Sequence, residues 1–268
     1  MSLLSVNGTN LYCETIGDGE PILMMHGGLG LDHTYFRPYF DQLSDQFKVI
    51  YYDHRGNGRS DKLEDYSTLT LDLLVDDAAQ LLDELGIEKT IVVGHSYGGF
   101  LAQLFAAKYP ARLSKLVLTN TIPTFDYQPQ PNGTDEQLAA FGAAFTRPME
   151  SNEDWRTVWT TLSQMYYKAY DPNIANQLDS ATHYTYEAWN AGSAALATYN
   201  TLEKLSSITA KTLNISGGHD FLCPAERGGA RINGLIPASE LTIMENSAHF
   251  PFIEEENNFF STLRNWLS

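Results

Sequence analysis

The stretch VVGHSYGGFLAQLFAAKYP, residues 92–110, decides the fold. It begins as an apolar run typical of a buried strand, passes through the pentapeptide Gly94–Gly98 and continues as a helical pattern. The pentapeptide matches the pattern G-x-S-x-G, with Ser96 at its centre. Its two glycines permit a sharp turn, because a side chain at either position would collide with the neighbouring strand and helix. Strand, serine turn and helix in direct succession indicate a nucleophile held clear of a sheet.

A serine hydroxyl becomes an effective nucleophile only when a base removes its proton and a third group orients that base. Two later strands end in residues that suit these roles. Asp220 follows the apolar run that starts at Lys211, and His249 follows the final apolar run. Asp126, after the preceding strand, is an alternative acid for the same histidine. The chain order serine, acid, histidine leads us to predict that Ser96, Asp220 and His249 form a catalytic triad.

Such a site also needs two backbone N–H groups that stabilise the oxyanion of the transition state, each contributing roughly 3 to 4 kcal/mol. Tyr97 directly follows the serine, so its N–H is one predicted donor. The glycine-rich loop HGGLGLDH, residues 26–33, follows an earlier strand. We predict that the N–H of Gly28 in this loop is the second donor. His26 and His95 lie beside these loops and are expected to be structural.

The other apolar runs predict a mostly parallel, eight-stranded sheet with helices on both faces, which is an α/β fold. The first two runs form a hairpin with Asn7–Gly8 at its turn. Six later runs, each ending in glycine, a polar residue or histidine, are predicted to be buried parallel strands: PILMMHGG, KVIYYDHRG, TIVVGHS, KLVLTNT, KTLNISGGHD and ELTIMENSAH. Helical patterns cover residues 34–46, 70–86, 98–109, 224–235 and 252–267.

Residues 123–205 differ in character from the rest of the chain. A turn-rich polar linker is followed by helical segments rich in aromatic residues, with no strand pattern. We predict that this segment is a helical cap over the carboxyl edge of the sheet. About a third of its aromatic side chains are expected to face the site: the set is Trp155, Trp159, Tyr166, Tyr167, Tyr170, Tyr184, Tyr186, Trp189 and Tyr199. The chain is then one domain, residues 1–268, with 123–205 as its cap insertion.

Charge and composition restrict the partners. Seventeen Lys and Arg against 33 Asp and Glu give a net charge of -16, which disfavours nucleic acid and anionic membrane surfaces. No apolar run approaches the roughly 18 residues that a membrane span needs, and no export leader is evident, so a cytoplasmic protein is expected. Cys13 and Cys223 are far apart in sequence and are expected to be free thiols. The expected partner is a small-molecule acyl substrate, and the sequence does not distinguish a monomer from a homo-oligomer.

Five segments resemble motifs of the α/β-hydrolase superfamily, and together they span essentially the whole chain: HGG at 26–28, YYDHRGNGRSD at 51–61, GHSYGG at 94–99, GGHD at 217–220 and NSAHFPFIEE at 246–255. The resemblance implies the α/β-hydrolase fold and a triad of Ser96, Asp220 and His249. It further implies an acyl-enzyme intermediate, no metal and no organic cofactor. Asp53, Arg55 and Ser60 are expected only to hold their loop in place.

Within the superfamily, HGGLGLDHTYF and GHSYGGFLAQLFAAKYP look most like the proline iminopeptidase branch, whose members cleave an amino-terminal residue. The chain has Leu29 where members usually have proline. It has Phe221 where some members have a glutamate that binds the substrate's ammonium group. Acidic residues of the cap offer substitutes for that glutamate: Glu136, Glu150, Glu153, Asp154, Asp171, Asp179 and Glu187.

We therefore predict a serine hydrolase that cleaves a small carboxylic ester, thioester or lactone with a mostly apolar acyl group. An aminopeptidase of the proline iminopeptidase type is the alternative, and a noncatalytic binding protein on the same fold is a third reading. Carbon–carbon bond hydrolases and perhydrolases also remain compatible with the motifs. Epoxide hydrolases and haloalkane dehalogenases are disfavoured, because they use an aspartate where this chain has Ser96.

Overall fold

The computed structural model describes residues 2–268 and places eight strands in one sheet, in the order β1-β2-β4-β3-β5-β6-β7-β8. Strands β1 (Ser2–Val6) and β2 (Thr9–Ile16) form an antiparallel hairpin, and β2 also pairs antiparallel with β4. Both hairpin turn residues, Asn7 and Gly8, have positive φ, as a two-residue turn of this kind requires. The other neighbouring strands pair in parallel: β3 (Glu20–Met25), β4 (Phe47–Tyr52), β5 (Thr90–His95), β6 (Leu113–Thr119), β7 (Lys211–Gly217) and β8 (Ser239–Met244). The predicted hairpin and six parallel strands are confirmed.

The central strands are buried along most of their length, which is why their sequences are continuous apolar runs instead of alternating ones. Strand β8 differs, because most of its residues are partly or fully exposed. It lies at the edge of the sheet, beside β7 alone. The prediction that all six runs are buried is therefore wrong for β8.

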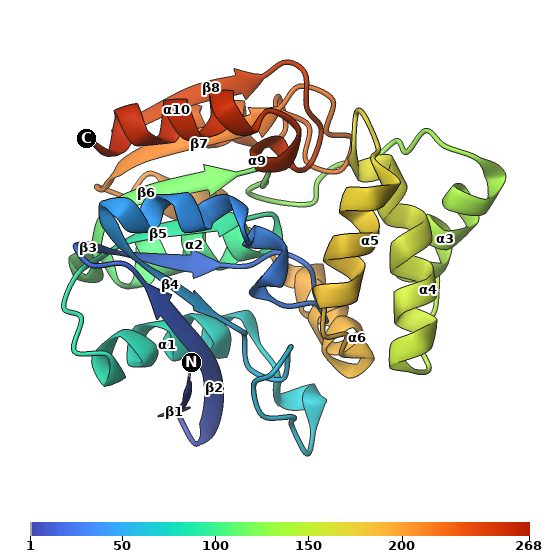
Figure 1. Cartoon of the computed structure of the whole chain (residues 1–268), viewed down its shortest axis with the longest axis horizontal. Helices are drawn as coiled ribbons and strands as arrows, with labels where there is room; N and C mark the ends of the chain where they lie inside the picture. The colour runs from blue at the N-terminus through green and yellow to red at the C-terminus, as the bar shows by residue number, and fades with distance from the viewer. Residues whose placement is uncertain (1) are drawn as a thin grey trace.

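Two of the predicted helices are confirmed closely, as α1 (Leu71–Glu84) and α2 (Tyr97–Lys108). The Thr70 hydroxyl accepts the N–H of Leu73 and caps the start of α1, while Gly86 follows its end at positive φ. Figure 1 shows α10 (Glu256–Leu267) in front of the sheet and α2 behind it. Within residues 2–268, no helix has both the length and the apolar composition that crossing a bilayer demands.

The predicted helix over 34–46 is instead two short 3₁₀ helices, η1 (His33–Phe36) and η2 (Tyr39–Asp45). Pro38 lies between them and has no N–H to donate, so one continuous helix does not form. The Phe40 ring from η2 packs edge to face against Phe259 and Phe260 of α10. This aromatic packing holds η2 against α10.

The last two predicted helices are shorter than their patterns suggest. Helix α8 covers only Gly229–Leu235, because Gly228 directly before it has non-helical backbone angles. A Cβ at Gly228 would lie 2.2 Å from the Thr121 carbonyl oxygen, which explains the glycine there. The segment 252–267 divides into α9 (Pro251–Glu254) and α10. Glu255 separates them with non-helical backbone angles, and its carboxylate accepts the N–H of Asn246 at 2.8 Å.

Between β6 and β7 the chain forms helices with no named strand, as predicted: α3 (Asp135–Thr146), α4 (Asn152–Leu162), η5 (Ser163–Tyr166), α5 (Pro172–Ala181), α6 (Tyr186–Ala195), η6 (Leu196–Thr198) and α7 (Leu202–Leu205). An isolated bridge between Thr124 and Asn200 joins the two ends of this segment. Figure 1 shows α3 to α6 beyond the strand ends to which the arrows point. The helical segment therefore covers the carboxyl edge of the sheet.

The connector 182–185, between α5 and α6, is tied to loops that follow β3 and β4. Both the N–H and Nδ1 of His183 lie within 3.0 Å of Asp32 Oδ2. The N–H of Thr185 donates to the Gly30 carbonyl at 2.8 Å, and its hydroxyl accepts from Lys62 at 2.6 Å. These contacts fix one side of the cap to the sheet domain, and we call residues 182–185 the cap tether.

Candidate active site

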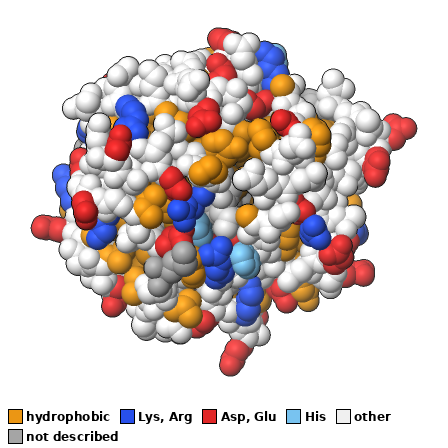
Figure 2. All heavy atoms as spheres, in the orientation of Figure 1, with side chains coloured by type: hydrophobic (Ala, Val, Ile, Leu, Met, Phe, Trp, Pro, Cys, Tyr) orange, Lys and Arg blue, Asp and Glu red, His pale blue; other side chains and the backbone are white. Residues whose placement is uncertain are grey.

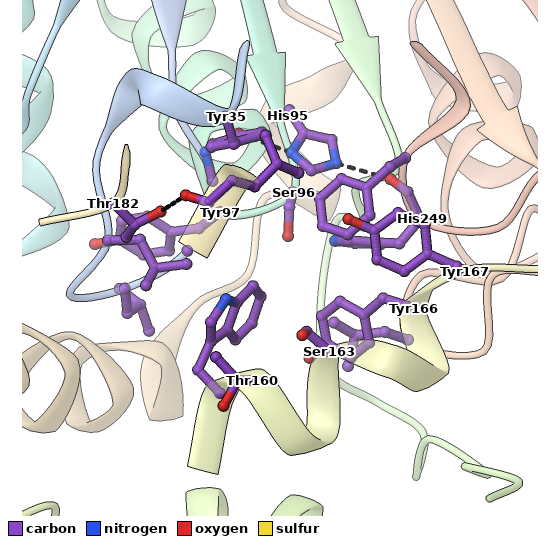
Figure 3. Close-up of a pocket in the computed structure, with 18 of the residues that line it drawn as sticks. Tyr35, His95, Ser96, Tyr97, Thr160, Ser163, Tyr166, Tyr167, Thr182 and His249 are labelled. Carbon is purple, nitrogen blue, oxygen red and sulfur yellow. Dashed lines mark hydrogen bonds between the residues drawn. The ribbon is translucent and has the colours of Figure 1, made fainter. Parts of the chain in front are cut away.

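Ser96 stands at the turn between β5 and α2, with φ 53° and ψ -119°. A non-glycine residue rarely adopts positive φ, so the surrounding packing must hold this strained conformation. A Cβ at Gly98 would lie 1.9 Å from the Met25 carbonyl oxygen, which explains the glycine there. Close packing thus surrounds the turn, and the Ser96 hydroxyl is directed into a cavity (Figure 3).

Asp220 and His249 form a buried pair, joined by a 2.7 Å contact between Oδ2 and Nδ1. Oδ2 also accepts from the Asn120 amide at 2.8 Å, and Oδ1 accepts the backbone N–H groups of Leu222 and Cys223. Burial alone would raise the pKa of Asp220. The charge of His249 and these hydrogen bonds outweigh it and hold that pKa below its ordinary value. Asp220 is therefore a carboxylate, which only accepts hydrogen bonds, so Nδ1 of His249 is the donor in this contact.

A second histidine, His95, contacts the backbone of His249 and helps to fix its position. The ring of His95 contacts the His249 carbonyl oxygen through Nε2 at 2.9 Å and the Tyr35 hydroxyl through Nδ1 at 2.8 Å. The same hydroxyl accepts the N–H of Gly27 at 2.6 Å. Burial lowers the pKa of His95 well below its ordinary value, so the ring is neutral. His95 is thus structural, as predicted, and it links the histidine loop to the glycine-rich loop.

The two predicted oxyanion donors line the same cavity as Ser96. Tyr97 is the first residue of α2, so its N–H has no acceptor within the helix. In the glycine-rich loop, the N–H of Gly27 donates to Tyr35 and that of Gly30 to Asn57. Within residues 2–268 no acceptor engages the N–H of Gly28, whose φ of +70° turns the loop at this point. Both donors are therefore free to bind a ligand beside Ser96.

A buried charged cluster supports the far end of this loop. His33 Nδ1 lies 2.6 Å from Asp53 Oδ1, and His33 Nε2 lies 3.5 Å from Glu14 Oε1. Burial alone would lower the pKa of His33, but its hydrogen bonds to these two carboxylates raise it to about 9. His33 is thus a buried cation between two anions. Asp53 also accepts the N–H of Arg59, in agreement with the loop-holding role expected for its segment.

The cavity has an internal volume of about 140 Å³ and mostly aromatic walls. Of the nine cap aromatics considered above, five line it, which is more than the expected third: Trp159, Tyr166, Tyr167, Tyr170 and Trp189. Figure 3 shows Thr160 and Ser163 of the cap across the cavity from Ser96. Phe125, Phe145 and Tyr170 line the cavity and are exposed, so part of its aromatic wall reaches the protein surface. Figure 2 shows hydrophobic side chains gathered near the middle of one face, with acidic side chains scattered around them.

Charged groups are scarce on these walls. Among the cavity-lining residues in the described part of the chain, Asp179 carries the one carboxylate. It is already paired with Arg156 at 2.7 Å and accepts the Tyr184 hydroxyl at 2.8 Å. The other six cap acids that were candidates for an ammonium site do not line the cavity. Asp126, the alternative triad acid, is paired with Arg231 at the surface.

The structure thus brings all five predicted site residues together. Sequence reasoning did not identify Tyr35 and Asn120, which hold the glycine-rich loop and the acid. Asn120 carried a usable signal, because it is a polar residue at the end of a parallel strand. Tyr35 carried none, since its hydroxyl joins Gly27 to His95, a residue 60 positions away in the sequence.

A family model described as the alpha/beta hydrolase fold matches residues 20–256. The chain belongs to the α/β-hydrolase family. The proline iminopeptidase PfmaB of Pestalotiopsis fici is 29% identical to this α/β hydrolase, with 100% of this chain and 99% of the relative covered. Among solved structures, the enol-lactonase from Burkholderia xenovorans LB400 has a TM-score of 0.82 at 22% identity, covering 99% of both chains. A thermophilic esterase from Thermogutta terrifontis has a TM-score of 0.77 at 25% identity, covering 99% of this chain and 96% of its own.

The family match makes the chain a hydrolase and confirms the predicted fold class. It also weighs against the reading of a noncatalytic binding protein, because relatives over the full length are named as enzymes. The names of these relatives differ in substrate. The substrate of this α/β hydrolase therefore depends on the chemistry of its own cavity.

Proposed function

We propose that this hydrolase cleaves a small carboxylic ester, thioester or lactone whose acyl group is mostly apolar. The observation that carries the proposal is the aromatic cavity beside Ser96, where the one carboxylate among the lining residues of the described chain is already paired with Arg156. A substrate ammonium group would be desolvated there without a free counter-charge, which costs several kcal/mol. An apolar acyl chain instead gains about 25 cal/mol for each Å² that it buries. The likeness to the Thermogutta esterase supports the same substrate class.

In the proposed mechanism, the Ser96 hydroxyl attacks the substrate carbonyl while His249 Nε2 takes its proton. Asp220 holds the histidine in the required tautomer and stabilises the imidazolium that forms. The N–H groups of Gly28 and Tyr97 stabilise the oxyanion. The tetrahedral intermediate expels the alcohol or thiol, which receives the proton from His249, and leaves an acyl-enzyme. Water, activated by the same base, then releases the acid and restores Ser96.

We propose further that residues 1–268 act as one hydrolase domain whose segment 123–205 is a substrate-selecting cap. The support is that the cap contributes Trp159, Tyr166 and Trp189 to the cavity, while the sheet domain contributes Ser96 and His249. The cytoplasmic location expected from the sequence stays a prediction, which cell fractionation tests.

The replacement Ser96→Ala tests the proposal. It should remove nearly all turnover of a p-nitrophenyl ester and all labelling by a fluorophosphonate, with the far-ultraviolet circular dichroism unchanged. Ser207→Ala is the matched control, because Ser207 is exposed and distant from the cavity. Ser96→Ala protein that keeps most of the wild-type turnover would refute the assignment.

An aminopeptidase of the proline iminopeptidase type is the second candidate, and the full-length likeness to PfmaB favours it. The two candidates differ in their need for a free amine. We expect kcat/KM for proline p-nitroanilide to be no higher than that for its N-acetylated form, and both to fall far below the values for apolar esters. A strong preference for the free amine would establish the peptidase instead.

A further inference from the structure

Three side chains with metal-binding atoms meet on one wall of the cavity: those of Asp220, Cys223 and His249. One ligand atom from each lies within 4.8 Å of the other two, and all three residues are buried. Cys223 and His249 are also among the residues that line the cavity, so the cluster adjoins it. Spacing in the sequence did not predict this cluster, because the ligands come from two loops that the parallel sheet places side by side.

We propose that these three residues form an inhibitory site for a borderline-soft divalent cation, with Zn²⁺ as its ligand. One thiolate, one imidazole nitrogen and one carboxylate oxygen make a donor set that Zn²⁺ binds in proteins, and a water from the cavity completes the tetrahedron. Two anionic ligands neutralise the ion, so no net charge is buried. The inference rests on the proposed function in one respect, since inhibition requires that His249 is the catalytic base.

The distances permit this coordination with small movements. Zinc-to-ligand distances of roughly 2.0 to 2.3 Å place the donor atoms of a tetrahedral site roughly 3.3 to 3.7 Å apart. The Nδ1–Oδ2 distance of His249 and Asp220, now 2.7 Å, would open by roughly half an ångström. The Cys223 sulfur lies within 4.8 Å of one ligand atom of His249 and one of Asp220, so it would move inward by roughly an ångström. The Cys223 N–H already donates to Asp220 Oδ1 at 3.0 Å, so its backbone is held beside the site.

The proton balance explains why binding would inhibit. Zn²⁺ takes the place of the Nδ1 proton and forms bonds to Nδ1 of His249, Oδ2 of Asp220 and Sγ of Cys223. The imidazole keeps its single proton, which moves to Nε2, and the thiol proton leaves to solvent. No atom changes oxidation state. With Nε2 protonated, His249 no longer accepts the proton of Ser96, and activity returns when a chelator removes the ion.

The first test is the inhibition of p-nitrophenyl ester hydrolysis by Zn²⁺ in wild-type, Cys223→Ala and Cys13→Ala protein, each compared with its own metal-free rate. Cys13 is the matched control, because it is equally buried but lies in β2, away from the cavity. We expect Cys223→Ala to raise the inhibition constant for Zn²⁺ about tenfold or more and Cys13→Ala to leave it unchanged. Mg²⁺ should not inhibit, because it prefers oxygen ligands. Equal inhibition of the wild type and Cys223→Ala would overturn the proposal.

The second test needs no catalysis and separates this site from the proposed function. Co²⁺ replaces Zn²⁺, and a thiolate ligand gives it a sulfur-to-metal charge-transfer band in the near ultraviolet. We expect this band in the wild type, in Cys13→Ala and in Ser96→Ala, and its loss in Cys223→Ala. If Ser96→Ala keeps both its turnover and the band, the proposed function fails while the metal site stands. If the folded wild-type protein shows no band, the metal site fails whatever Ser96 does.

Discussion

At the scale of single residues, the reactive groups are held by neighbours that do no chemistry themselves. Asn120 anchors Asp220, and Tyr35 with His95 connects the glycine-rich loop to the carbonyl of His249. The five residues predicted to form the site could be picked out from the sequence, because each follows a strand or a glycine turn that has a recognisable local pattern. The anchoring residues depend on contacts across the fold, so their roles were visible only in three dimensions.

Asn120 offers a test of this anchoring. Its amide donates to both Asp220 Oδ2 and the Ala248 carbonyl, and its φ is 47°. Asn120→Gly removes the amide without strain, since glycine tolerates positive φ. A hydrogen bond to a charged group is worth about 1.5 to 3 kcal/mol, so kcat on an apolar ester should fall by about tenfold or more. The exposed Asn257→Gly is the control, and an unchanged kcat in Asn120→Gly would show that the acid is positioned without the amide.

His33 gives the protein a pH-dependent stability. Its pKa of about 9 in the folded chain lies above the ordinary value near 6.5, so the protonated ring favours folding. This contribution is complete below about pH 6.5 and is lost as the pH rises through about 9, with a magnitude on the order of 3 kcal/mol at most. Urea unfolding across that interval should show the decline, and His33→Gln should flatten it. His219→Ala, at an exposed histidine, is the reference variant. If the free energy of unfolding of His33→Gln falls with pH as steeply as that of the wild type, His33 is not the source of the pH dependence.

At the scale of elements, apolar periodicity was sufficient for the strands and for α1 and α2, because regular burial leaves a regular pattern. It was insufficient where a single residue breaks the pattern, as Pro38 does between η1 and η2 and Glu255 does between α9 and α10. Backbone geometry at those positions depends on packing and on partners from other segments. The residues that line the cavity could not be predicted from the sequence either, since a helical pattern does not specify which of its aromatic side chains face the sheet.

Two glycines in helices show how strongly location decides the outcome of one substitution. At Gly98, in α2, a Cβ would lie 1.9 Å from the Met25 carbonyl, so Gly98→Ala should displace the nucleophile turn and destabilise the fold severely. At Gly142, in α3, a Cβ meets nothing within 4 Å, and Gly142→Ala should stabilise by about 0.5 to 1 kcal/mol. Thermal unfolding of the Gly98→Ala and Gly142→Ala variants measures both effects. If Gly98→Ala has the same melting temperature as the wild type, the nucleophile turn is not tightly packed.

At the scale of the whole molecule, the excess of acidic residues sets how the protein responds to salt. With a net charge of -16, repulsion between carboxylates opposes the compact state, and added salt screens it. Most of the exposed ion pairs contribute little, so their screening should not cancel this gain. We therefore expect the melting temperature to rise from low to physiological ionic strength, as measured by calorimetry in sodium chloride. A falling melting temperature would mean that attractive pairs dominate the surface.

The cap tether has a consequence for how this hydrolase changes its specificity. Asp32 and Gly30, which receive His183 and Thr185, belong to the same short loop as Gly28. The proposed cap and the proposed oxyanion donor thus depend on one piece of backbone. A cap transplanted from a relative would not be sufficient by itself, because its connector must form hydrogen bonds to the glycine-rich loop of this protein. Exchanges that carry residues 182–185 together with residues 28–33 should yield active chimeras, and evolution of new substrates in this fold is expected to alter the two segments in concert.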